Sequence, residues 1–323
     1  MSVPVVDPTR RPRRPTAPDG LVVVDKPAGL TSHDVVARMR RIAGTRKVGH
    51  AGTLDPMATG VLVIGIGRAT RLLTYVVGAD KEYVATIRLG ASTTTDDAEG
   101  ETVSVTDASS VSRSAIDAGV AALTGPIEQV PSSVSAIKVD GKRAYARVRE
   151  GEQVQLAARP VTIRRFDVHE VRPVVVAVTD GVVADVAGLD VDVTVVCTSG
   201  TYVRALARDL GASLGVGGHL TALRRTRVGG YRLDVARTLE EIDASPEDVP
   251  IAVLPLAAAA RATFPVRELT ADEAAALSYG KRIAGGQPCP DGPVAAISPD
   301  GALVALLDER GDEAAPVLVF APA

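Results

Sequence analysis

Strand-like and helix-like segments follow one another in this chain without the regular alternation that a parallel sheet needs. Three strand-like runs, at residues 161–168, 173–178 and 191–198, come in succession, and amphipathic helical patterns lie at about 112–124 and 199–211. Parallel strands are joined by crossover helices, whereas antiparallel strands are joined by short turns. The order therefore predicts an α+β fold with a mixed, mainly antiparallel sheet flanked by helices.

The chain is expected to divide into two domains of unequal size. Its 323 residues are too many for one small domain. Residues 1–20, with RRPRRP at 10–15, lack the apolar core of a signal peptide and predict a disordered basic arm. The proline-containing, acidic stretch at about 244–264 is the expected hinge. We therefore expect a large domain at 21–245 and a small β-rich domain at 250–323.

Charge is distributed unevenly along the chain, although the net charge is only -3. Residues 1–80 hold 12 Lys and Arg against 6 Asp and Glu, and short blocks at 138–149 and 201–232 are also basic. Residues 240–323 hold 5 basic against 14 acidic residues, so the average conceals a basic face that could bind phosphates. Blocks of this kind at 138–149 and 224–232 are either phosphate contacts or simply solvated faces.

Several classes of protein are not expected from the composition. No apolar run approaches the roughly 18 residues of a membrane helix, so no membrane partner is predicted. Two cysteines, Cys197 and Cys289, are too few for a disulfide framework or a zinc site, and they indicate a reducing cytoplasm. The four histidines are widely spread, so we expect no metal.

One segment, KVGHAGTLDPMATGVLVIGIGRATR at residues 47–71, concentrates glycines around an Asp-Pro pair. A residue before proline is pushed out of the α region, so the backbone at Asp55 is expected to be extended. Its neighbours Leu54, Pro56 and Met57 are apolar, and a partly desolvated carboxylate needs a cation or hydrogen-bond donors. The segment is therefore either a structural turn, the common use of such residues, or a site that holds one carboxylate still.

The same segment resembles the signature of the bacterial tRNA pseudouridine-55 synthase family, which modifies the T-loop of tRNA. The resemblance continues in four further motifs in the family's order, and together they span roughly residues 21–240. These motifs are VVDKPAGLTSHDVV, DKEYVATIRLG with TDDAEG, PSSVSAIKVDGKRAYARVREG, and SGTYVRALARDLG, ending in GGHLTALRRTRVGGY. The resemblance implies isomerisation of uridine to pseudouridine at position 55 of tRNA.

This reaction breaks the bond from C1′ to N1, turns the base and joins C1′ to C5, without any redox change. It therefore needs no metal and no nucleotide cofactor, which agrees with the composition. The buried uridine must first be flipped out of the RNA loop, at a cost of about a few kcal/mol. The resemblance implies tRNA, through its T-arm, as the partner.

Three residues are expected to be catalytic by resemblance. Asp55 is the implied nucleophile, and sequence does not distinguish attack at C1′ from attack at C6. Tyr83 is implied to stack on the flipped base and to offer its hydroxyl as a proton acceptor; on its own it would be a core tyrosine. Arg204 is implied to pair with the catalytic carboxylate, whereas its helical pattern alone suggests an exposed arginine.

Five further residues are expected at the substrate by resemblance. His50 is implied to bind the T-loop RNA, and Leu223 to close the base pocket. For the other three an alternative stays open. Lys26 either touches the site or a phosphate or is a solvated turn lysine, Tyr202 either lines the pocket or caps a helix, and Asp97 either assists RNA contact or is an exposed loop acid.

The C-terminal part resembles a small RNA-binding β-barrel, the PUA domain, only in its architecture. It is acidic, so its role in RNA binding rests on a local Lys281–Arg282 patch or is absent. Two other functions are considered: a non-catalytic tRNA-binding and folding protein, and the catalytic subunit of a guide-RNA-dependent complex. We expect a cytoplasmic monomer that works alone.

Overall fold

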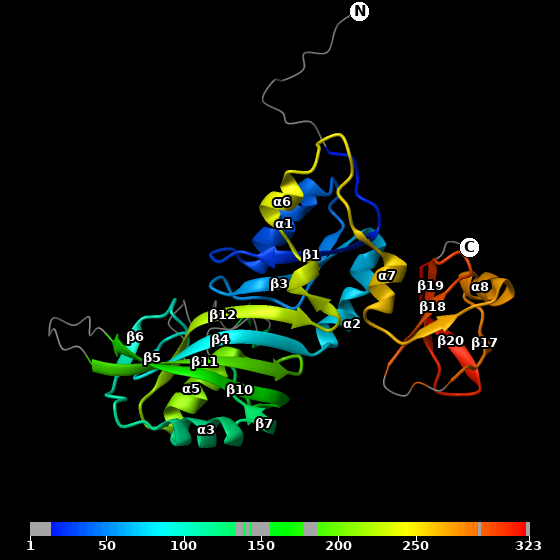
Figure 1. Ribbon diagram of the computed structural model, residues 1–323. Helices are drawn as coiled ribbons and strands as arrows, with labels where there is room; N and C mark the ends of the chain where they lie inside the picture. The colour runs from blue at the N-terminus through cyan, green and yellow to red at the C-terminus, as the bar shows by residue number, and fades with distance from the viewer. Residues whose placement is uncertain are drawn as a thin grey trace, which may run out of the picture.

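The computed structural model describes residues 14–132, 138–139, 142–143, 156–176, 186–287, 289 and 292–320. Within these residues a large mixed sheet and a smaller second sheet form two domains (Figure 1). The predicted α+β class is confirmed. The predicted basic block at 138–149 lies largely outside the described residues, and only its strands β8 (Lys138–Val139) and β9 (Lys142–Arg143) are placed.

The large sheet has a long antiparallel centre with parallel pairs toward one edge. Its path runs through β14 (Arg237–Thr238), β1 (Gly20–Lys26), β3 (Thr59–Ile66), β12 (Gly218–Val228), β4 (Lys81–Leu89), β11 (Val186–Cys197), β10 (Arg159–Val176) and β7 (Gly125–Gln129). Strand β12 pairs with β3 in parallel but with β4 antiparallel. Three short strands join from the side: β2 (Val48–Ala51), β13 (Tyr231–Arg232) and β15 (Leu254–Pro255).

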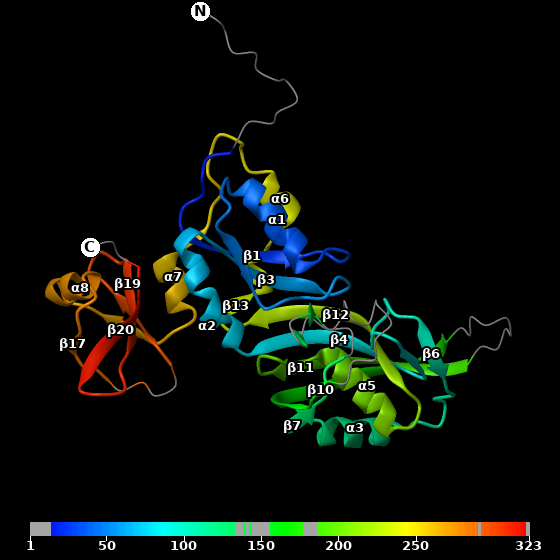
Figure 2. The same ribbon diagram turned by 180° about the vertical axis from the view of Figure 1, so that it is seen from behind.

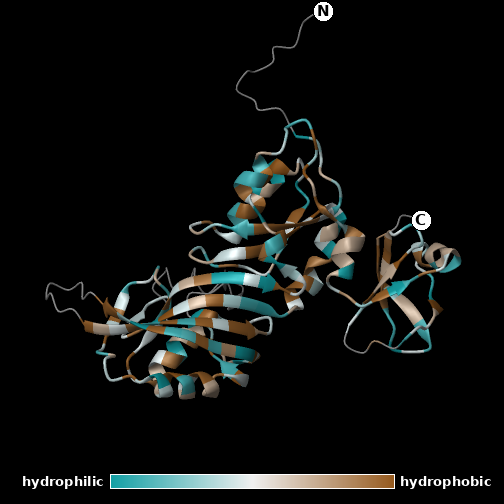
Figure 3. Ribbon diagram, viewed as in Figure 1, coloured by the Kyte–Doolittle hydropathy of each residue, from teal (hydrophilic) through white to brown (hydrophobic). Residues whose placement is uncertain are grey.

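Alternation along β4 gives this part of the sheet one buried and one more solvated face, whereas β3 is buried on both faces. In β4 the odd-numbered residues from Lys81 to Leu89 are buried, and the even-numbered ones are half-buried or exposed. Hydrophobic and hydrophilic bands alternate along the strands in Figure 3. The helices α3 (Arg113–Ala122) and α5 (Val203–Ser213) lie on the buried face, as both views show (Figures 1 and 2). Their apolar residues join those of β4, β10 and β11 in one core.

Helix α1 (Ser32–Ile42) begins directly after its N-cap residue Thr31. Thr31 and Asp34 form a capping box, each side chain accepting from the other's backbone N–H. Val35, Val36 and Met39 face a second core with α6 (Leu239–Asp243). The remaining connections of this domain are η1 (Gly67–Arg71), α2 (Leu73–Gly78), η2 (Leu233–Val235) and the hairpin of β5 (Ala91–Thr93) with β6 (Thr102–Val105).

The predicted disordered arm at 1–20 needs correction at its C-terminal end. Arg14 donates to the backbone carbonyl of Asp243 at 2.5 Å, and the Ala17 N–H donates to Ala43 at 2.9 Å. These contacts fix the chain from residue 14 onward, because each one satisfies a polar group on an ordered helix end. Residues 1–13 lie outside the described part of the chain.

The boundary between the domains comes later than the predicted end at residue 245. Strand β15 pairs with β1, so the large sheet reaches Pro255. Helix α7 (Leu256–Arg261) then lies between the sheet and the C-terminal domain (Figure 1). That domain contains β16 (Val266–Glu268), α8 (Ala271–Ser278), β17 (Ile283–Ala284), β18 (Val294–Ile297), β19 (Leu303–Asp308) and β20 (Glu313–Val319).

The C-terminal domain is β-rich, as predicted, and it packs against the large one. Apolar residues of both domains share a core that includes Leu21, Phe264 and Phe320. Arg71 donates to the Val319 carbonyl at 2.7 Å and lies 5.4 Å from the centre of the Phe320 ring. In the predicted Lys281–Arg282 patch, Arg282 pairs with Glu313 at 3.0 Å. One of the two cations is therefore already neutralised.

Candidate active site

Asp55 lies in the loop between β2 and β3, and Ser32 fixes the residue that precedes it. Ser32, at the start of α1, accepts from the Leu54 N–H at 2.9 Å and donates to the Leu54 carbonyl at 3.1 Å. Leu54 is buried, whereas the Asp55 side chain is 37% exposed. The loop therefore presents one reachable carboxylate from an apolar base, as the sequence predicted.

Two glycines allow the sheet to approach this loop. Gly52 has φ +76° and Gly60 has φ +99°, a region that L side chains rarely adopt. A Cβ added at Gly60 would lie 2.2 Å from the backbone oxygen of Arg225 on the adjacent strand β12. Glycine at 60 is thus required by close backbone contact as well as by its torsion.

Lys26 lies beneath the Asp55 loop, where it is shielded from solvent. Its side chain is fully buried, and its ammonium donates to the carbonyls of Pro27 at 2.9 Å, Leu30 at 2.6 Å and Pro56 at 3.1 Å. Burial lowers the pKa of Lys26 to about 8, and the nearby Asp55 carboxylate opposes that shift. The solvated-turn alternative is wrong, because this lysine ties the Asp55 loop to the end of β1.

Arg204, in the first turn of α5, reaches Asp55 from the opposite side of the site. Its Nε lies 3.0 Å from Asp55 Oδ2, and its Nη1 lies 3.4 Å from Asp97 Oδ2. The arginine side chain is 5% exposed, so the exposed-helix alternative is wrong and the predicted pair with Asp55 is present. A buried guanidinium between two carboxylates orients both of them.

Asp97 is the buried one of the two acids beside Arg204. Its side chain is 3% exposed, so the exposed-loop alternative is wrong. Thr95 donates to Oδ1 at 2.5 Å, and the Glu99 N–H donates to it at 3.0 Å. The carboxylate therefore supports Arg204 from behind, while Arg204 also donates to the Thr95 carbonyl at 2.7 Å.

A cavity of about 250 Å³ opens beside Asp55. Its walls include Tyr83 from β4, Leu223 from β12 and Tyr202 at the N-terminus of α5. Tyr202 satisfies both alternatives, because it lines the cavity and is also the N-cap residue of α5, though its side chain makes no capping hydrogen bond. Tyr83 is 7% exposed, and burial raises its pKa, an effect that the nearby Arg225 opposes.

His50 lies on β2, next to the cavity loop but outside the cavity's lining. Its ring meets that of His33 edge to face, with the ring centres 5.6 Å apart. Burial lowers the pKa of His50 to about 4, and the charges of His33 and Arg225 act in the same direction. The imidazole is therefore neutral at pH 7 and a weak base, which agrees with a binding role better than with proton transfer.

The sequence analysis missed Arg225 and Lys81, which both line the cavity. Arg225 was placed in a basic surface block at 224–232, yet it is fully buried, and its neighbour Arg224 pairs with Asp25 at 2.6 Å. Burial lowers the pKa of Lys81 to about 8, and its ammonium donates to the carbonyls of Val77 and Ala79. Successive side chains of a strand point to opposite faces of the sheet, so the sequence of β12 could have shown that only one of Arg224 and Arg225 faces solvent.

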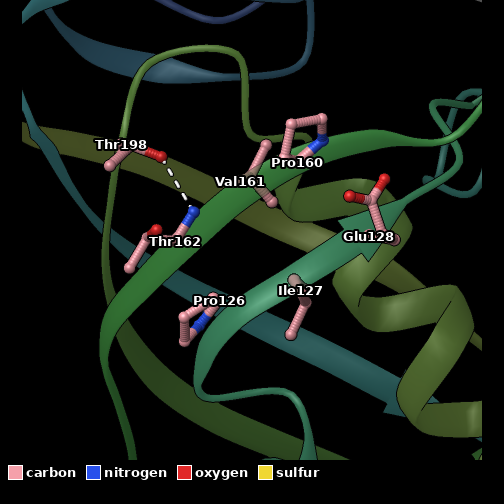
Figure 4. A pocket seen from close by; sticks show the side chains of 7 residues that line it. All are labelled: Pro126, Ile127, Glu128, Pro160, Val161, Thr162 and Thr198. Carbon is pink, nitrogen blue, oxygen red and sulfur yellow. Dashed lines mark hydrogen bonds between the residues drawn. The ribbon is translucent and has the colours of Figure 1, made fainter.

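A second cavity, of about 270 Å³, lies at the edge strand β7 (Figure 4). It is lined by Pro126, Ile127, Glu128, Pro160, Val161, Thr162 and Thr198, and the Thr162 N–H donates to the Thr198 hydroxyl at 3.0 Å. Glu128 is the single ionisable residue of this lining. The cavity beside Asp55 combines a carboxylate, a guanidinium and an aromatic wall, so it is the better candidate for chemistry.

Comparison with known proteins shows both the class of this enzyme, a pseudouridine synthase, and its family. The TruB family pseudouridylate synthase N-terminal domain matches residues 40–203. The C-terminal domain of tRNA pseudouridylate synthase B matches residues 204–249, and that of tRNA pseudouridine synthase II matches 264–321. The chain belongs to the TruB family of pseudouridine synthases.

Individual relatives are similar over nearly the whole chain. The tRNA pseudouridine synthase B of Arthrobacter sp. strain FB24 is 65% identical over 312 residues, covering 94% of this chain and 97% of the relative. That of Streptomyces griseus subsp. griseus is 59% identical over 307 residues, covering 95% and 98%. A solved Cbf5–Nop10–Gar1 complex contains a similar chain, with a TM-score of 0.69 and 26% identity, covering 94% of this chain and 85% of that one.

No helix in the described part of the chain is long and apolar enough to span a membrane.

Proposed function

We propose that this protein isomerises uridine to pseudouridine at position 55, in the T-loop of tRNA. One observation carries the proposal: the Asp55 carboxylate, paired with Arg204 at 3.0 Å, stands at a cavity walled by Tyr83 and Leu223. Relatives named tRNA pseudouridine synthase B, at 59–65% identity, support tRNA as the substrate. Because tRNA is handled in the cytoplasm, we place the protein there.

Asp55 is the nucleophile in this proposal. The side chain is 37% exposed, so a flipped nucleotide can reach it, and Arg204 holds it in one orientation. In the C1′ route the carboxylate oxygen bonds to C1′ as the C1′–N1 bond breaks, and the freed base turns in the cavity. Its C5 then bonds to C1′ as the carboxylate leaves, and the proton lost from C5 is balanced by one taken up at N1. The overall change moves one glycosidic bond and is redox-neutral.

The cavity walls keep the freed base in place. Tyr83 offers an aromatic face, and stacking on such a face contributes roughly 1–3 kcal/mol per base. Leu223, from the neighbouring strand β12, adds an apolar wall to the cavity, and Tyr202 stands at the start of α5. The Tyr83 hydroxyl is the proposed acceptor of the C5 proton, and its burial excludes competing water.

His50, Lys26 and Asp97 serve the site from outside the cavity. His50 is proposed to contact the T-loop RNA, since it is neutral at pH 7 and lies on the strand that leads into the Asp55 loop. Lys26 and Asp97 act through other residues: Lys26 holds the Pro56 carbonyl, and Asp97 holds Arg204. Both are therefore proposed as positioning residues rather than substrate contacts.

The test uses purified wild type and Asp55→Asn with an unmodified tRNA transcript and no guide RNA. We expect wild type to form pseudouridine in the T-loop, and Asp55→Asn to bind tRNA with unchanged affinity but form none. Asp117→Asn, which alters an exposed aspartate on α3, is the matched control and should be fully active. Pseudouridine formation by Asp55→Asn would refute the mechanism, and binding without product by wild type would favour a folding or guide-dependent role.

A further inference from the structure

Arg225 is the most deeply buried charged residue that borders the proposed active site. Its side chain is fully buried, and it lines the cavity beside Asp55. Burying a guanidinium costs free energy unless its donors are all satisfied. Such a residue is therefore expected to have a specific task.

Its first set of contacts holds the loop that carries Asp55. Arg225 Nη2 donates to the Gly52 carbonyl at 2.9 Å, Nη1 to the Thr53 carbonyl at 3.3 Å, and Nε to the Val61 carbonyl at 2.7 Å. These carbonyls come before and after Asp55, so one planar guanidinium fixes both ends of the loop. All three acceptors are neutral carbonyls, so these bonds do not neutralise the charge of Arg225.

Its second contact is with Tyr83. Arg225 and Tyr83 are directly paired residues of the antiparallel strands β12 and β4, so their side chains leave the same face of the sheet side by side. Both side chains are buried and line the cavity beside Asp55, and the Arg225 charge lowers the pKa of the phenol against the larger effect of burial. The positive charge therefore lies beside the oxygen that would take up the C5 proton.

We infer that Arg225 is a positioning residue for the reaction, which acts by holding the Tyr83 hydroxyl in place within the base cavity. The inference rests on the proposed function and adds a second arginine to the site. Arg204 serves the nucleophile from α5, and Arg225 serves the proton acceptor from β12. A hydroxyl that is free to rotate would meet the C5 proton less often, because proton transfer requires hydrogen-bond distance.

The decisive experiment is a double-mutant cycle between Arg225→Gln and Tyr83→Phe. Pseudouridine formation in a tRNA transcript is measured under single-turnover conditions with enzyme in excess, and tRNA affinity is measured separately. We expect Arg225→Gln to slow the reaction about 100-fold, as misplacement of a reacting group does, with tRNA affinity unchanged. In the Tyr83→Phe background the same substitution should have an effect at least about 10-fold smaller, because the hydroxyl is gone and only the contacts with the Asp55 loop are still lost.

Controls separate positioning from loss of folding. Arg165→Gln removes an arginine from the solvated face of the same sheet and should leave the rate unchanged. Arg225→Lys keeps the charge but not the planar fork, so we expect it to be about 10-fold slower than wild type. Should Arg225→Gln not fold, Arg225→Lys replaces it in the cycle, and its effect must also be smaller in the Tyr83→Phe background than in wild type.

Each other outcome overturns the inference. If the rate losses of Arg225→Gln and Tyr83→Phe simply multiply in the double variant, Arg225 serves only the Asp55 loop. If Tyr83→Phe is as active as wild type, the reaction does not use the hydroxyl. An Arg225→Lys variant as fast as wild type would also refute positioning by the planar guanidinium group. Failure of wild type to form pseudouridine would instead refute the proposed function itself.

Discussion

Replacing Arg204 by methionine should destabilise the protein, because the arginine lies between two acids. The substitution keeps the length of the side chain and removes its charge. It leaves Asp97, 3% exposed, without its cation, and Asp55, 37% exposed, with water as the remaining partner. Breaking a buried ion pair by removing one partner costs about 3–5 kcal/mol.

The structure places the expected loss near the lower end of that range. Asp97 keeps two donors, the Thr95 hydroxyl at 2.5 Å and the Glu99 N–H at 3.0 Å, and Asp55 is partly solvated. We therefore expect Arg204→Met to lower the free energy of unfolding by about 3 kcal/mol. Adding Asp97→Asn should recover about half of the loss, since the amide removes the unpaired buried charge.

Urea unfolding followed by circular dichroism measures these differences, because the chain has no tryptophan to serve as a fluorescent probe. Arg113→Met is the control: it breaks an exposed pair with Asp117 on α3 and should cost about 0.3–0.5 kcal/mol. A loss below about 1 kcal/mol for Arg204→Met would refute the reasoning, as would a further loss on adding Asp97→Asn.

Three further predictions concern other parts of the molecule. The pKa of His50 is lowered from 6.5 to about 4, so the unfolded chain binds this proton more tightly and stability should fall as the pH drops from 6.5 to 4. In His50→Gln the free energy of unfolding, measured by urea unfolding at each pH, should change less between pH 6.5 and 4. An unchanged dependence on pH would contradict the burial of the ring. Gly60→Ala should cost more than about 2 kcal/mol or prevent folding, because its Cβ would lie 2.2 Å from the Arg225 backbone oxygen, and a thermal melt equal to wild type would exclude that clash. Arg71→Ala should loosen the C-terminal domain by about 1–2 kcal/mol through the lost bond to Val319 and the lost contact with Phe320; faster limited proteolysis between the domains measures it, and wild-type cleavage rates would count against the contact.

Much of the fold followed from local pattern. The amphipathic patterns at about 112–124 and 199–211 predicted helices, which the structure places at Arg113–Ala122 and Val203–Ser213. The runs at 161–168 and 173–178 form one strand, Arg159–Val176, because pairing with β11 continues past the irregularity between Val168 and Glu170. Short strands such as β2 and β15 gave no pattern of their own, since a few residues carry too little periodicity.

The sequence by itself determined the extended, glycine-flanked loop at Asp55, because proline and glycine restrict or free the backbone locally. Its motifs also identified the candidate catalytic residues Asp55, Tyr83 and Arg204. Only the tertiary structure decided which charges are buried. Asp97 and Arg225 occur in polar stretches, and Lys26 precedes a turn. All three positions suggest the surface, yet each residue is enclosed where segments distant in the sequence meet. Burial depends on those distant neighbours, and so no local pattern of residues fixes it.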